Sequence, residues 1–218
     1  MWSYVRKSVP SALVLAVAIA ATGATPHPLG AQTAKDQIAF GDREYAEHKT
    51  QSALDSYMKP LSLEAKNYEA LWKASRAAGR KALTLGTRDR IKYANIVRLE
   101  SLDALKADSL HSGALHVLGM WSAETMRING LARAFAKAFL GADVFALASW
   151  NEAQRLLELA VKVDSTRIVH RLDLAAIYAD RGDKARAREQ YEFIAKAPLH
   201  DVTDPLYKKQ AAERLRKL

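Results

Sequence analysis

The chain has 218 residues, of which 49% are hydrophobic and 26% are charged, a composition that suits one globular domain with a sizeable core. It contains no cysteine, which excludes thiol catalysis, thiolate metal ligands and stabilisation by disulfides. The formal net charge of +9 is compatible with anionic partners, but the basic residues are scattered and lack the interleaved aromatics of a nucleic-acid-binding surface, so no nucleic acid is expected as a partner.

The first segment of the chain predicts a secretory signal peptide. Arg6 and Lys7 form a short basic region, residues 9–21 are almost wholly apolar, and a stretch rich in helix breakers follows over 22–31. That order of basic, apolar and small-residue regions is typical of an export signal. The apolar run is too short to cross a bilayer comfortably, and an uncleaved membrane anchor is the alternative interpretation.

Cleavage of this signal is expected after Ala31, with Ala24 as the alternative site. The sequence therefore divides into a signal peptide over 1–31 and a mature domain over 32–218 that has no transmembrane span. Because no cysteine is present to accept a lipid, a lipoprotein anchor is excluded. These features predict a periplasmic or secreted protein.

Apolar residues of the mature domain recur with helical spacing, and no useful length of chain alternates with period two. The capping pattern Thr33-x-x-Asp36 predicts the start of the first helix. A second helix is expected over 53–61. Pro60 lies in this helix without a backbone donor, which predicts that the helix kinks or ends there.

The middle of the chain continues with three further helices. Asn67 predicts the cap of the first of these helices. Gly86-Thr87 predicts a stop followed by the cap of the next, which is expected over 91–105. Another helix is expected over 114–126.

An apolar insertion over 131–147, which includes Phe135 and Phe145, separates these helices from the last ones. The remaining helices are predicted from caps and breakers, namely a capping box at Ser149-x-x-Glu152, a start at Thr166, a stop at Gly182, a cap at Asp183 and a first-turn proline at Asp204-Pro205.

The helices come in pairs that repeat every 34 residues. Ala153 and Ala187 are separated by this interval, as are Leu157 and Tyr191, and as are Gly41 and Ser75. A small residue in one helix lets the second helix approach closely, and a large aromatic residue one turn further on fills the gap. A single pair cannot bury its apolar face, so neighbouring pairs must stack and a polar helix must close the end.

The chain resembles tetratricopeptide repeats at particular residues. The clearest stretch runs from Leu174 to Asp183 and continues to Tyr191. Its resemblance to a tetratricopeptide repeat lies in a close-packing small residue, an inter-helix tyrosine, a turn glycine, and an alanine and an aromatic residue in the second helix (Ala175, Tyr178, Gly182, Ala187 and Tyr191). Further matches are Gly41, Ala53 and Tyr57, and the junction from Ala104–Asp108 to Leu118-Gly119. The resemblance implies an all-α fold, a tetratricopeptide-like α-solenoid of about four helical hairpins plus a C-terminal capping helix.

Within this superfamily the order of features is similar to the regulator of microtubule dynamics family. The similar features are the segment 115–121, the apolar insertion, a well-formed last repeat and a closing helix, and the resemblance covers residues 34–217. The chain departs from the repeat pattern at Pro60, Ser109 and Ser165, and matches it weakly at Val97 and Ser101. Because an exported protein does not meet microtubules, the family name does not predict the function of this chain.

The sequence contains no pattern that predicts an active site. It lacks the Gly-x-Ser-x-Gly nucleophile motif, the dinucleotide-binding glycine fingerprint and the phosphate loop. Glu44 and His48 are four residues apart and have the spacing to share a metal, but a dedicated site needs three or four ligands. The sequence therefore predicts no enzyme, no cofactor and no metal.

The first helices of stacked pairs line the concave side of a solenoid, where partners bind. The repeat phase places six residues toward this groove: Tyr45, Trp72, Arg76, His116, Met120 and Glu124. Aromatic rings and methionine offer apolar contact, and a guanidinium recognises a carboxylate or phosphate. The alternative for Trp72 and Met120 is burial between the pairs, and Trp121 and Trp150 are assigned to the core.

Two functional hypotheses follow from this groove. The first is a non-catalytic scaffold that holds an extended segment or a helix of a protein or peptide partner in the cell envelope. The second is a carrier of an apolar or amphipathic ligand such as a lipid, because the insertion at 131–147 has the composition to wall off one side of a groove.

Overall fold

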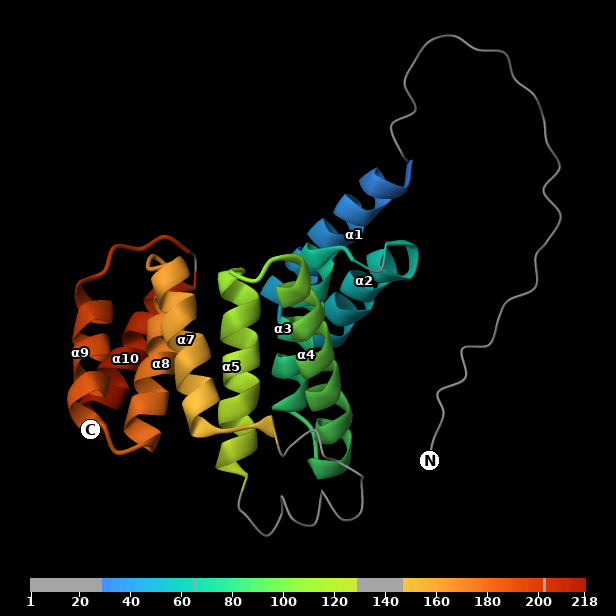
Figure 1. The fold of residues 1–218 in the computed structure, drawn as a ribbon. Coiled ribbons are helices and arrows are strands. Elements are labelled where there is room, and N and C mark those ends of the chain that lie inside the picture. Colours follow the sequence, from blue (N-terminus) through green and yellow to red (C-terminus); the bar gives the residue numbers. More distant parts are fainter. Residues whose placement is uncertain (1–28, 65, 129–146, 202) are drawn as a thin grey trace, which may run out of the picture.

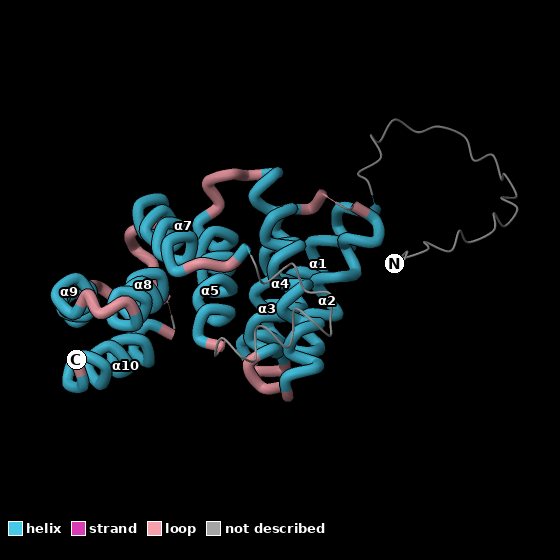
Figure 2. The backbone as a smooth tube through the Cα atoms, turned by 60° about the horizontal axis from the view of Figure 1, so that its bottom comes forward, coloured by secondary structure: helices cyan, strands magenta, loops and turns pink. Residues whose placement is uncertain are grey.

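The computed structural model describes residues 29–64, 66–128, 147–201 and 203–218, and in these ranges the chain is helical and contains no strand. Figure 1 shows the helices in chain order and Figure 2 shows the same elements joined by loops. The helices are α1 (Leu29–Ala46), α2 (Thr50–Leu63), α3 (Tyr68–Ala82), α4 (Thr87–Ala107), α5 (Ser112–Arg127), α7 (Trp150–Val163), α8 (Ile168–Asp180), α9 (Lys184–Lys196) and α10 (Asp204–Lys217).

The helices pack as successive hairpins. The pairs are α1 with α2, α3 with α4, α5 with α7, and α8 with α9, while α10 packs on α8 and α9 at the C-terminal end. Each hairpin also contacts the next one along the chain, so the hairpins form a stack (Figure 1). This arrangement confirms the expected solenoid of four hairpins and a closing helix.

The first helices of the hairpins are neighbours of one another. In the stack, α3 contacts both α1 and α5, and α8 contacts both α5 and α10. We call the side formed by α1, α3, α5 and α8 the first-helix face, and the side formed by α2, α4, α7 and α9 the second-helix face. The predicted binding residues all come from the helices of the first-helix face.

The close approach inside the first hairpin depends on Gly41. A Cβ atom at this position would lie 2.5 Å from Cε1 and 2.8 Å from Cδ1 of Tyr57, which is too close for real atoms. Tyr57 is fully buried, and its hydroxyl donates to Oδ1 of Asp42 at 2.8 Å. The glycine and the tyrosine thus have the small-residue and aromatic roles that the repeat pattern assigned to them.

The same packing recurs between α5 and α7. A Cβ atom on Gly119 would lie 3.1 Å from Cγ of Leu157 and 3.3 Å from the carbonyl oxygen of Ala153. Both of these α7 residues are fully buried. The helices of this hairpin therefore meet where the sequence has its smallest side chain.

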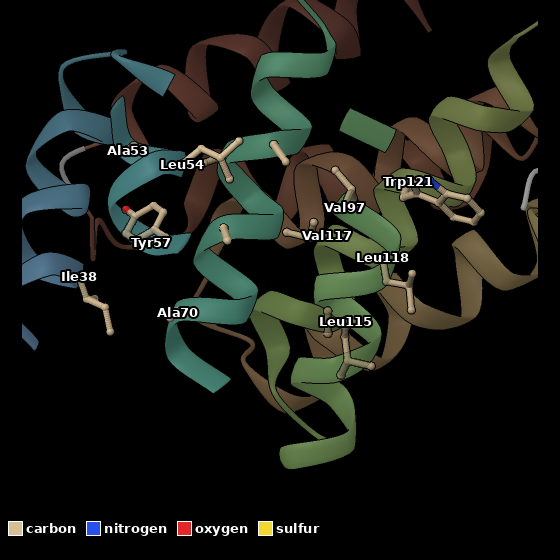
Figure 3. Close-up of a cluster of buried hydrophobic side chains, with 14 of the residues drawn as sticks. Ile38, Ala53, Leu54, Tyr57, Ala70, Val97, Leu115, Val117, Leu118 and Trp121 are labelled. Atoms are coloured by element: carbon tan, nitrogen blue, oxygen red, sulfur yellow. The ribbon is translucent and has the colours of Figure 1, made fainter. Parts of the chain in front are cut away.

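The core has two large parts along the stack. The first contains side chains from α1 to α7, and Figure 3 shows it from Ile38 on α1, through Tyr57, to Leu118 and Trp121 on α5. The second lies between α5 and α10 and contains Ala175, Tyr178, Ala187 and Tyr191, the residues of the best-matching repeat. Trp121 is buried as expected, and Trp150 packs against the second part with some of its surface exposed.

The weak repeat match in the second hairpin has a structural reason. Ser75 on α3 and Ser101 on α4 are both fully buried, and their hydroxyl oxygens lie 2.5 Å apart. The Ser75 hydroxyl also donates to the carbonyl oxygen of Val97 at 2.8 Å. Two small polar residues satisfy each other here, so the hairpin closes without the alanine and aromatic pair found elsewhere.

Three predicted caps are confirmed. The side chains of Asn67, Ser149 and Asp183 accept hydrogen bonds from the backbone N–H groups three residues later, at 3.1, 3.0 and 3.0 Å. Gly182 has φ +82°, the left-handed conformation that ends α8, and Pro205 lies in the first turn of α10 as expected.

Four local predictions are wrong or need correction. Helix α1 begins at Leu29 and not at Thr33, because Ala31 and Gln32 are good helix formers and no breaker follows Gly30. Helix α2 continues one turn beyond Pro60 to Leu63, and the Glu64 N–H donates to the Pro60 carbonyl at 2.8 Å. The remaining two corrections concern N-caps, which lie at Gly86 rather than Thr87 and at Arg167 rather than Thr166.

The predicted cleavage position after Ala31 falls inside α1. Most of the predicted signal peptide and of the 131–147 insertion lies outside the described residues, so both stay predictions. Within the described ranges, no helix combines the length and apolar character needed to cross a membrane.

Candidate functional site

Three of the predicted binding residues meet on the first-helix face. The guanidinium carbon of Arg76 lies 4.1 Å from the ring centroid of Tyr45 and 4.7 Å from that of Trp72. Arg76 and Trp72 are one turn apart on α3, and Tyr45 lies in the last turn of α1. Aromatic faces attract a guanidinium at such distances, so the three side chains form one cluster, which we call the arginine–aromatic cluster.

Arg76 is positioned by stacking more than by ion pairing. Its Nε atom is buried and has no hydrogen-bond partner among the residues that the structure describes, and its Nη2 atom lies 3.8 Å from Oδ1 of Asp42. The Asp42 carboxylate instead accepts from Nζ of Lys73 at 2.6 Å and from the Tyr57 hydroxyl at 2.8 Å. Since 28% of the Arg76 side chain is exposed, its guanidinium can reach a ligand on this face.

Tyr45 lies between two arginines. The guanidinium carbon of Arg80 is 4.0 Å from its ring centroid, on the same helix as Arg76. Burial raises the pKa of the Tyr45 hydroxyl, while the charges of Arg76 and Arg80 act in the opposite direction. Tyr45 therefore stays neutral and serves the cluster as an apolar and hydrogen-bonding surface.

His111 joins this cluster to the start of α5. Its ring centroid lies 5.0 Å from that of Trp72 and 5.9 Å from that of Tyr68. Its Nδ1 atom accepts a hydrogen bond from the backbone N–H of Ala114 at 3.1 Å, so the imidazole caps α5. Burial lowers the pKa of His111, which favours the neutral ring that this cap requires.

A second polar group lies where α5 meets α8. Nε2 of His116 is 2.9 Å from Oδ2 of Asp173, and the ring of His116 lies 4.8 Å from the ring of His170. His170 is only 3% exposed, and neither of its ring nitrogens has a hydrogen-bond partner among the described residues. Burial, together with the nearby His116, Arg167 and His111, lowers the pKa of His170 to about 2.

Glu124 and Met120 do not join the arginine–aromatic cluster. Glu124 pairs with Arg127, which also donates from Nη2 to Oδ2 of Asp180 on α8 at 2.6 Å. Met120 is partly buried and packs against the second part of the core. The six predicted residues thus divide into the arginine–aromatic cluster, the pair made by His116, the ion pair made by Glu124, and Met120 at the core.

The segment between α9 and α10 lies near the arginine–aromatic cluster. Hydrogen bonds from the Thr203 backbone and hydroxyl lower the pKa of Asp201, and the charges of Arg167 and Arg76 lower it further. Tyr207 on α10 is close enough to Tyr45 to act on its pKa. The first and last thirds of the chain therefore approach each other at this cluster.

Sequence reasoning missed Asp42, His111, His170 and Asp173. Asp42 follows Gly41 and faces the aromatic residue of the same repeat, which is a usable signal once the repeat phase is known. Asp173 and His116 are 57 residues apart, and no local pattern connects them.

The described residues include no group of three or more histidine or acidic side chains placed to hold a metal ion. In particular, Glu44 lies 3.5 Å from Nζ of Lys49, and His48 lies beyond the end of α1 with φ 62°.

A family model described as regulator of microtubule dynamics protein 1-3 matches residues 31–218. A search of curated proteins found no significant match. Among solved structures, the chain is similar to a MamA protein, with 17% identity, 86% of each chain covered and a TM-score of 0.48.

Two further solved structures are similar to the chain. The first tetratricopeptide domain of Spaghetti (RPAP3) bound to an HSP90 peptide is 15% identical, covers 69% of this chain and 94% of its own, and has a TM-score of 0.47. A thermophilic tetratricopeptide protein of Thermus thermophilus is 15% identical, covers 82% and 98%, and has a TM-score of 0.45.

Proposed function

The chain belongs to the regulator of microtubule dynamics protein 1-3 family, and from this premise we propose that it is a non-catalytic scaffold that binds a protein or peptide partner through its first-helix face. The arginine–aromatic cluster carries this proposal. It presents a partly exposed arginine against two aromatic rings, a combination suited to holding a partner and not to breaking bonds.

The cluster favours a partner segment that combines an acidic group with an apolar one. The guanidinium of Arg76 supplies donors for a carboxylate, and Tyr45 and Trp72 supply flat apolar surface on either side. Tyrosine, tryptophan and arginine are also the residue types that contribute most to the affinity of protein interfaces. We therefore expect the acidic group of the partner to lie over Arg76.

This proposal is tested by selecting peptides that bind residues 32–218 from a random-peptide display library. The selected peptides are expected to be enriched in Asp or Glu next to an aromatic or aliphatic residue. Trp72→Ala is expected to weaken their binding about 30-fold or more, since a central aromatic anchor contributes about 2 kcal/mol or more. Arg76→Lys is expected to weaken it about tenfold, because lysine keeps the charge and loses the planar stacking.

Leu99→Ala is the matched control for these variants. Leu99 is a large apolar residue that is 46% exposed on α4, on the second-helix face. This variant is expected to bind the selected peptides as well as the unchanged protein does. Peptides without acidic enrichment, whose affinity for the Trp72→Ala protein is unchanged, would contradict the proposal.

We place this scaffold in the cell envelope, because the first 31 residues have the order of an export signal. The lipid-carrier hypothesis is distinguished by native mass spectrometry of the protein purified from its own cells. A reproducible extra mass that is released as lipid on denaturation would favour the carrier. The bare mass of the polypeptide is the result expected for the scaffold.

A further inference from the structure

Two histidines on the first-helix face, the half-buried His111 and the buried His170, are placed so that a proton would disrupt their contacts. His111 caps α5, and His170 lies on α8 against His116 of α5. His170 therefore belongs to the contact between the third and fourth hairpins, which we call the α5–α8 joint, and the charge of His111 at the start of α5 acts on it. The chemistry at the two rings differs.

The cap made by His111 requires a neutral ring. Its Nδ1 atom accepts the hydrogen bond from the Ala114 N–H, and a backbone N–H can only donate, so Nδ1 must carry a free lone pair. In the protonated imidazolium both ring nitrogens are donors, so protonation removes the acceptor. The added positive charge would also lie at the helix N-terminus, where the backbone dipoles disfavour it.

The position of His170 excludes a charge for a different reason. Its ring is buried, neither nitrogen has a partner in the described part of the chain, and a charged imidazolium in that place would be cut off from solvent without a paired carboxylate. Opening the joint would expose the ring to water. Protonation would therefore favour the open arrangement over the closed one.

The neighbouring charged groups do not remove this sensitivity. His170 faces His116 and His111 from α5 and Arg167 at the start of α8, and all three lower its pKa. The carboxylate of Asp173, one turn further along α8, is paired with His116. His111 faces Asp108 and Glu69, which raise its pKa, and Arg167, which lowers it, but burial is the largest effect and lowers the pKa.

We propose that His111 and His170 make the α5–α8 joint an acid-sensitive switch, closed while both rings are neutral and open when they take up protons. Because the ring of His111 packs against Trp72, opening the joint also disturbs the arginine–aromatic cluster. This second step rests on the proposed function of the cluster. The opening of the joint itself is measurable without any partner.

The absence of cysteine allows a direct test by site-directed spin labelling. Ser109 and Ser165 are exposed residues in the turns before α5 and α8, and these turns lie at the same end of the stack (Figure 1). Spin labels attached to Ser109→Cys and Ser165→Cys report the separation of the two helices, which is measured by pulsed electron–electron double resonance. The distance distribution is compared at pH 7.5 and pH 5.0, with circular dichroism at both.

The expected result is one narrow distance distribution at pH 7.5 and a second, longer component at pH 5.0 without loss of helix. Each pH unit below about 6.5 favours the open form by up to tenfold per histidine. The variant His111→Asn with His170→Leu is expected to stay closed at pH 5.0, since asparagine caps a helix without titrating. The control variant, His48→Gln with His200→Gln, removes two exposed histidines and is expected to open like the parent protein.

Three results would overturn the inference. The first is an unchanged distance distribution at pH 5.0, and the second is opening of the His111→Asn, His170→Leu variant to the same extent as the parent. The third is helix loss at pH 5.0 in both proteins, which would show general acid unfolding. None of these results bears on whether peptides bind the arginine–aromatic cluster at pH 7.5, so failure of the switch and failure of the binding site are distinguishable.

Discussion

Replacing Tyr57 by alanine is expected to lower the free energy of unfolding by about 3–5 kcal/mol, the range measured for deleting a large buried aromatic side chain. Tyr57 is fully buried inside the first hairpin, where its ring contacts Gly41 and its hydroxyl donates to Asp42. Removing it leaves a cavity and takes away one hydrogen bond of the Asp42 carboxylate. Urea unfolding followed by circular dichroism measures the change.

The glycine that faces this ring, Gly41, is expected to tolerate substitution poorly because an added side chain would overfill the contact. Gly41→Ala inserts a methyl group 2.5 Å from a ring that is held by packing and by its hydroxyl, and overpacking of this kind lowers stability by about 1–3 kcal/mol. Gly79→Ala is the matched control, because its Cβ would lie 3.6 Å from Val97 and meet nothing closer. This control is expected to be neutral or to stabilise α3 by up to about 1 kcal/mol.

The two changes are expected to be strongly coupled. In a chain that already carries Tyr57→Ala, the methyl group of Gly41→Ala enters space that the ring has left, so the second substitution no longer destabilises. A double-mutant cycle should therefore give an interaction energy of about 1–3 kcal/mol. Additive effects would show that the glycine and the tyrosine do not form the close contact on which the hairpin packing depends.

The second large effect concerns the pH dependence of stability and His170. The closed form of the protein holds the pKa of this residue near 2, mainly by burial, while the unfolded chain takes up the proton near 6.5. Between these values the unfolded state binds more protons, so stability falls as the pH falls below about 6.5 and is fully present above it. The loss from pH 6.5 to pH 5 is about 2 kcal/mol, at about 1.4 kcal/mol per pH unit.

His170→Leu is expected to remove this loss. The variant should be no less stable than the parent at pH 8, because it replaces two unpartnered buried nitrogens by apolar atoms. The difference in stability between the variant and the parent should be about 2 kcal/mol larger at pH 5 than at pH 8, in favour of the variant. His200→Gln, which changes an exposed histidine, should keep the pH dependence of the parent, and an equal pH slope in the His170→Leu protein would refute the assignment.

The features that the sequence predicts best depend on neighbouring residues. The caps at Asn67, Ser149 and Asp183 need only a side-chain oxygen and an N–H three residues later, and all three form. The capping pattern Thr33-x-x-Asp36 lies inside α1, because a capping pattern does not by itself end the helix before it. A capping residue is thus only part of a helix boundary, and the helix propensities of the residues that flank it decide whether the helix begins there.

The repeat phase predicts part of the candidate site. A period of 34 residues places Tyr45, Trp72 and Arg76 on helices of one face, and the structure brings these three together. It does not predict the bond between Lys73 and Asp42, which are 31 residues apart, or the pair made by His116 and Asp173. Those contacts depend on how neighbouring helices are tilted and rotated, which the pattern of a single chain does not contain.

Site-specific photo-crosslinking in intact cells of the source organism tests most directly whether a partner binds the first-helix face. A benzophenone amino acid replaces Tyr45 or Trp72 on this face, and Leu99 or Phe193, both exposed and apolar, on the second-helix face. We expect one partner to be captured from both Tyr45 and Trp72 and from neither Leu99 nor Phe193. Capture of a partner from Leu99 and Phe193, with none from Tyr45 and Trp72, would contradict it.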